Sequence, residues 1–198
     1  MNVVAAMSVV GWVVIVGALA AAAVLSVLAY LRPRPTPLWS AAGSLGLAIV
    51  AASTVPDDVP AVAAPLAGLL GMVVAVFGGS PAAATALQLA MGSSTPPGAH
   101  GGILVPVRSD EPAAPGVVPA RREVLRGGLT IGVLERLAAA GTIIAGFPEG
   151  LAIVVAVKGV GRFTELDAPE ARERFIIGTF ASLIWACAAA LAVHLAVR

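Results

Sequence analysis

Two long stretches of the chain carry no charged side chain. No Asp, Glu, Lys or Arg occurs from Met1 to Leu31, and none occurs from Val59 to Val107. Charged residues make up 12% of the chain and hydrophobic residues 59%, whereas soluble domains have about 25% charged residues. Because a helix of about 20 apolar residues crosses the hydrocarbon core of a bilayer, we predict an all-α, polytopic membrane bundle.

The charge pattern and the prolines predict about six transmembrane helices. Prolines separate neighbouring helices, because proline cannot continue a helix and favours an extended conformation in the residue before it. The fifth helix is short for a full crossing. The predicted spans are Met7–Leu31, Leu38–Val55, Ala61–Gly79, Gly127–Gly146, Leu151–Phe163 and Phe175–Val197.

The chain divides into three parts. Residues 1–91 form an apolar half with three spans, which ends in a short interfacial helix at residues 82–91. Residues 92–120 contain a high density of proline and glycine and predict a flexible cytoplasmic loop. Residues 121–198 form a second half with three spans. It begins with a short amphipathic segment at residues 121–126, which leads into the fourth span.

Arginine predicts the orientation of the chain. Most arginines fall in the loops that follow the first, third and fifth spans, whereas Asp57, Asp58 and Glu149 fall in the other turns. This distribution places both termini outside the cell. The ratio of eleven arginines to one lysine, with abundant alanine, indicates a GC-rich bacterial genome and therefore the bacterial cytoplasmic membrane. A cleaved signal peptide is the alternative for the first span, but no positive charge precedes it and it is too long.

Charged residues inside the second half form the main candidate site. The fourth span contains Glu135 and Arg136, and a charge at this depth must be paired or face water. If the fourth and fifth spans are antiparallel about Pro148, Glu135 lies level with Gly161, between Lys158 and Arg162. We predict a nearly neutral cluster close to the cytoplasmic face, consisting of Glu135, Arg136, Lys158, Arg162, Glu165 and Glu173. It either holds three helices together or serves an ion, proton or head-group site.

Small residues predict where helices pack in the second half. Gly128 and Gly132 form a GxxxG step, and Gly178 and Ser182 begin a four-residue repeat of small residues. His194 and His100 have no evident second ligand, and Cys187 is the only cysteine, so we expect no metal site and no disulfide. We also expect no cofactor, no catalytic residue and, with a net charge of +1, no nucleic-acid partner.

Residues 124–186 resemble an uncharacterised family of small bacterial integral membrane proteins. The resemblance rests on three motifs: IGVLER at residues 131–136, KGVGRFTEL at residues 158–166 and ERFIIGT at residues 173–179. Glycine stands at position 159, where the family pattern has serine. The resemblance implies a fold and the charged cluster, without an activity, and does not extend to the first half.

Three functions follow from these features. The favoured hypothesis is a non-enzymatic membrane module that assembles with itself or with a membrane-protein partner in the lipid bilayer. The alternative is a small transporter or channel that uses Glu135 as a relay or gate. A lipid-modifying enzyme is the third hypothesis, because Glu165 and Glu173 could serve as acid and base, but nothing in their spacing requires this.

Overall fold

Six helices and one short β-ribbon make up the described part of the chain. A computed structural model describes residues 3–32, 34–54, 60–92, 103–106, 121–124, 128–162 and 169–198. The helices are α1 (Val3–Leu31), α2 (Pro35–Ala52), α3 (Ala63–Met91), α4 (Gly128–Ile144), α5 (Gly150–Arg162) and α6 (Pro169–Val197). The strands are β1 (Ile103–Pro106) and β2 (Arg121–Val124). The predicted all-α bundle is therefore confirmed.

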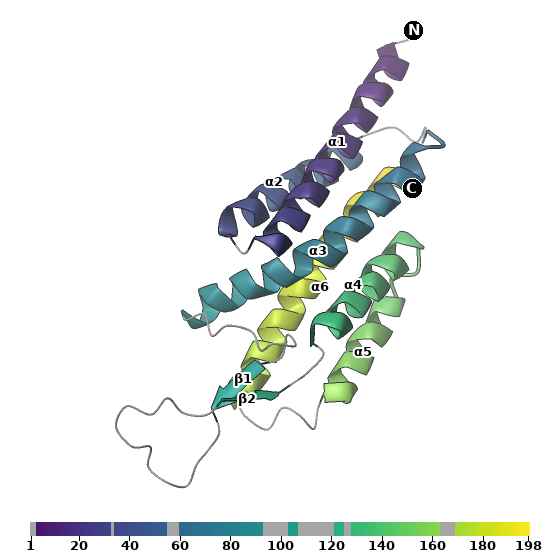
Figure 1. Cartoon of the computed structure of the whole chain (residues 1–198). Helices are drawn as coiled ribbons and strands as arrows, with labels where there is room; N and C mark the ends of the chain where they lie inside the picture. Colours follow the sequence, from purple (N-terminus) through teal and green to yellow (C-terminus); the bar gives the residue numbers. More distant parts are fainter. Residues whose placement is uncertain are drawn as a thin grey trace, which may run out of the picture.

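Helices α3 and α6 form the centre of the bundle (Figure 1). The α1–α2 hairpin packs on one side of this pair and the α4–α5 hairpin packs on the other. Helix α4 contacts both α3 and α6, whereas the contacts of α5 are chiefly with α4. The two halves of the sequence are thus joined along α3 and α6.

Four helices are long and apolar enough to cross a membrane. Their apolar segments are Met7–Leu31, Pro35–Ala52, Ala63–Met91 and Ala171–Val197. Helix α4 has 17 residues and α5 has 13, so both fall below the length of these four. The helices support a membrane protein. The first predicted span ends at Leu31, as α1 does, whereas α1 begins at Val3, four residues before the predicted start at Met7.

Several helix boundaries differ from those predicted, and the start of α2 and the end of α3 differ most clearly at prolines. Helix α2 begins at Pro35 rather than at Leu38, because proline is accepted in the first turn, where its missing N–H has no intrahelical partner. Helix α3 continues through Pro81 to Met91, so residues 82–91 are the last part of α3 and not a separate interfacial helix. Membrane helices tolerate an internal proline when neighbouring helices and hydroxyl side chains satisfy the backbone.

Small side chains line the contact between α3 and α6. Gly71 lies so close to α6 that a Cβ atom added to it would be 2.3 Å from Val193 Cγ2. Ala67 and Ala75 on α3 and Ala186, Ala189 and Ala190 on α6 are fully buried. Close backbone approach at small residues is how helices associate in lipid.

The first half of the chain has its own aromatic contacts. Trp12 of α1 has only 4% of its surface exposed and belongs to the bundle core. Tyr30, at the other end of α1, contacts Phe77 of α3 edge-to-face, with 5.5 Å between ring centroids. This contact fixes the end of α1 at the level of Phe77.

A two-stranded ribbon forms between α3 and α4. Strands β1 and β2 are antiparallel, with Ile103 opposite Val124 and Pro106 opposite Arg121. The segment at residues 121–126, predicted to be an amphipathic start to the fourth span, therefore contains a strand. The remainder of the predicted flexible loop, apart from Gly92 and β1, lies outside the described residues.

Candidate functional site

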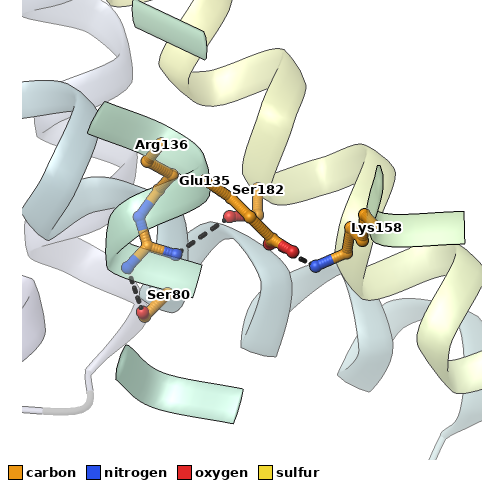
Figure 2. Close-up of polar contacts among 5 residues, drawn as sticks. All are labelled: Ser80, Glu135, Arg136, Lys158 and Ser182. Atoms are coloured by element: carbon orange, nitrogen blue, oxygen red, sulfur yellow. Dashed lines mark hydrogen bonds and ion pairs between the residues drawn. The ribbon is translucent and has the colours of Figure 1, made fainter. Parts of the chain in front are cut away.

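Glu135 and Lys158 form an ion pair between α4 and α5 (Figure 2). The side chain of Glu135 is only 14% exposed and that of Lys158 only 15%. Lys158 Nζ also lies 5.3 Å from the centre of the Phe175 ring on α6, within the range of a cation–π contact. Lys158 thus links α5 to both α4 and α6, and the antiparallel hairpin brings Glu135 to Lys158 as predicted.

Arg136 points away from this ion pair and into the contact between α3 and α6 (Figure 2). Successive residues of a helix are rotated by about 100°, so Glu135 and Arg136 reach different neighbours. Arg136 Nη1 donates a hydrogen bond of 3.0 Å to Ser182 Oγ on α6, and Nη2 donates one of 3.1 Å to Ser80 Oγ on α3. Adjacent residues of α4 therefore bind three different helices.

The guanidinium of Arg136 is almost fully enclosed. Its residue is 3% exposed, and its Nε atom is buried with no hydrogen-bond partner among the described residues. The two side chains that accept its hydrogen bonds, Ser182 and Ser80, are neutral hydroxyl groups and supply no opposite charge. Removing either hydroxyl partner would leave a buried charged group without an acceptor and lower the stability of the fold. The contact therefore favours one arrangement of α4 against α3 and α6.

Two glycines provide the space that Arg136 occupies. A Cβ atom at Gly79 of α3 would lie 2.2 Å from Arg136 Cδ, and one at Gly132 of α4 would lie 3.2 Å from Arg136 Nη1. Gly132 was predicted from a GxxxG step to pack against another helix. In the structure, the nearest atoms to its open side belong to Arg136 of its own helix.

A second polar contact joins α3 and α6, and its residue on α6, Trp185, lies three positions after Ser182. Trp185 Nε1 donates a hydrogen bond of 3.0 Å to the carbonyl oxygen of Val74. The indole can reach this carbonyl because Gly78 has no side chain: an added Cβ would lie 2.1 Å from Trp185 Nε1. Side chains from α4 and α6 therefore pack against three consecutive residues of α3, namely Gly78, Gly79 and Ser80.

The other predicted site residues lie apart from these contacts or outside the described part of the chain. Glu173 is exposed and lines an open hollow at the start of α6 with Pro169, Arg172, Ile176 and Ile177. The side chain of Arg162 and the whole of Glu165 lie outside the described residues. Gly128 is the first residue of α4, and Gly178 has only an ordinary contact with Leu87 on its open side.

Sequence reasoning missed Gly78, Gly79 and Ser80 as part of the site. These residues precede Pro81, and the sequence predicts that the third span ends at Gly79. The available signal was two glycines and a serine together within a long charge-free run, in a chain whose fourth span contains an arginine. Which helices face one another cannot be read from spacing when the segments are 46 and 56 residues apart along the chain.

Comparison with protein-family models, curated proteins and solved structures finds no match to the chain. The resemblance of residues 124–186 to an uncharacterised membrane-protein family thus stays a prediction.

The arrangement favours holding helices together over chemistry. Glu135 is neutralised by Lys158, and Arg136 is enclosed by small residues and hydroxyl groups. A general acid or base needs access to a substrate proton, whereas Arg136 is buried among side chains of the bundle and Glu135 is already paired with Lys158.

Proposed function

We propose that this protein is a non-enzymatic membrane module that assembles with itself or with another membrane protein. The observation that carries the proposal is that the charged side chains described at the middle of α4 and α5 bind neighbouring helices of the same chain. The α4–α5 hairpin is thereby fastened to α3 and α6, and the bundle can present a defined outer surface.

The open glycines of α2 provide a surface for assembly. Gly43 and Gly46 are exposed, and a Cβ added at either would meet no atom within 4 Å. Gly71, Gly78 and Gly79 differ, because side chains of the bundle already occupy the space beside them. Exposed glycines on an apolar helix allow the backbone of a second helix to approach closely in lipid.

The location we propose is the bacterial cytoplasmic membrane, with both termini outside. Arg32 and Arg34 follow α1, and the segment after α5 leads to Arg172 and Arg174 at the start of α6. These arginines support a cytoplasmic position for the corresponding ends of the bundle.

Cross-linking in native membranes tests the proposal. We expect a defined oligomer of the unmodified chain, or a complex with one partner, that is lost in Gly43→Leu and Gly46→Leu. Gly68→Leu on α3 is the matched control, since Gly68 also has no atom near its added Cβ but lies on another helix. A strictly monomeric chain, or an assembly insensitive to both α2 variants, would contradict the proposal.

Transport is the second candidate, and the partial exposure of the ion pair favours it. Glu135 and Lys158 each keep about one seventh of their surface exposed, so this intramembrane carboxylate, neutralised by a lysine, is not completely sealed inside the bundle. Ion or proton flux in proteoliposomes that is abolished by Glu135→Gln, with the protein still folded, would support transport. Flux that is absent, or unchanged in this variant, would exclude Glu135 as a relay.

A further inference from the structure

In the α4–α5 hairpin, the apolar segments between the charged residues and the turn are short. Between Arg136 and the turn, α4 contains only the apolar and small residues 137–144, and α5 contributes residues 151–157 before Lys158. From Arg136 to Phe147 a helix would rise about 17 Å, whereas crossing the hydrocarbon core takes about 30 Å.

Contacts with the long helices place Arg136 at one side of the bundle. Arg136 bonds to Ser80, which lies one turn beyond Phe77 on α3, and Phe77 is level with Tyr30 near the end of α1. Arg136 is therefore at about the level of Arg32, in the charged turn between α1 and α2. That turn lies towards one membrane surface, because two arginines in hydrocarbon would cost several kcal/mol.

The long helices extend further from this level than the hairpin does. From Ser80 back to Ala63, α3 rises about 26 Å, and from Ser182 to Val197, α6 rises about 23 Å. The hairpin turn falls short of both by about 6 to 9 Å. In Figure 1 the turn between α4 and α5 likewise stops before the start of α3 and before the C-terminus.

The turn itself is built to satisfy its backbone. Gly146, at φ 75°, ends α4: its N–H bonds to the Ile143 carbonyl oxygen, and the N–H of Phe147 bonds to that of Thr142. These are the two bonds of a Schellman motif. Pro148 has no N–H, and the N–H groups of the first three residues of α5 bond to carbonyls of the turn, at residues 147, 148 and 149. A turn below the membrane surface needs such internal pairing.

We infer that α4–α5 is a re-entrant hairpin. It enters from the side of the α1–α2 turn and reverses before it reaches the opposite surface, so that four helices cross the membrane rather than six. Both termini stay on one side, because the hairpin begins and ends on the same side. The exposed carboxylate of Glu149 lies in the turn, and water and head groups reach down to it through a locally thinned bilayer.

Single cysteines introduced into a Cys187→Ala background test this inference in native membranes. Glu149→Cys and Phe147→Cys probe the turn, Thr54→Cys probes the opposite surface, and Arg34→Cys probes the side of the α1–α2 turn. Phe147→Cys keeps the test valid if replacement of Glu149 prevents folding. Each variant is treated, from the side that labels Thr54→Cys, with a small charged methanethiosulfonate and with a maleimide carrying a large polyethylene glycol.

The inference predicts that both turn cysteines react with the small reagent but react at least ten-fold more slowly than Thr54→Cys with the bulky one. They react fully with both reagents after denaturation. Equal rates at the turn and at Thr54→Cys with the bulky reagent would show that the turn emerges at the surface. No reaction with either reagent before denaturation would show a turn sealed in lipid. Either result overturns the inference.

Discussion

The side chain of Arg136 on α4 occupies the space that a side chain at Gly79 on α3 would need. A Cβ atom at position 79 would lie 2.2 Å from Arg136 Cδ, well inside van der Waals contact. The same arginine donates hydrogen bonds to Ser80 on α3 and Ser182 on α6. One buried side chain therefore determines how three helices approach one another.

Gly79→Ala should destabilise the bundle by about 1 to 3 kcal/mol, because the added methyl group must displace Arg136 or move α3. The measurement is unfolding by SDS in mixed micelles. Gly46→Ala is the matched control, since its added methyl group meets no atom within 4 Å, and its stability should be unchanged or slightly raised. Equal effects of the two substitutions would show that α3 and α4 are not packed this closely.

Ser80→Ala and Ser182→Ala should each lower the free energy of unfolding by about 1 to 3 kcal/mol, because each leaves a buried guanidinium N–H without an acceptor. Ser44→Ala is the control, since its hydroxyl bonds only to the carbonyl of Ser40 in its own helix. Both effects should disappear in an Arg136→Met background. If the serine substitutions cost as much without the arginine, the hydrogen bonds are not the cause.

Trp185→Phe should cost about 0.5 to 1.5 kcal/mol, because it keeps an aromatic ring beside Gly78 but loses the hydrogen bond to the Val74 carbonyl. Trp39→Phe is the comparison, as Trp39 is 60% exposed on α2 and its replacement should be nearly neutral. Thermal unfolding in detergent, followed by circular dichroism, measures both. A larger loss for Trp39→Phe would contradict the assigned packing of α6 on α3.

The sequence predicts the helices well where charge alone defines them. The first span is predicted to end at Leu31, and α1 ends there, because the charge-free run ends directly at Arg32. Proline is a weaker signal inside a membrane protein. Pro81 does not end α3, since a helix in lipid is held by its neighbours as well as by its own hydrogen bonds.

The candidate site is predictable only where it depends on local geometry. Glu135 and Lys158 lie 23 positions apart around one tight turn, so their pairing follows from an antiparallel hairpin. The contacts of Arg136 with Ser80 and Ser182 depend on how α4 packs against α3 and α6. Periodicity within a helix contains no information about such packing, and the predicted grouping of Arg136 with Lys158 missed it.

The central claim is that the charged residues of α4 hold the hairpin to the bundle, and a double-mutant cycle at Glu135 and Lys158 tests it most directly. The cycle uses Glu135→Gln, Lys158→Gln and the double variant, with unfolding followed in mixed micelles. Each single change should cost about 1 to 3 kcal/mol, less than a fully enclosed pair because both side chains keep some exposure. A cycle of Glu149→Gln with Lys158→Gln is the control.

The account predicts that the double variant is more stable than the sum of its single changes implies, by at least about 1 kcal/mol. The control cycle should be additive within about 0.5 kcal/mol. Additive losses at Glu135 and Lys158, or no loss in either single variant, would contradict the claim that this ion pair fastens α5 to α4.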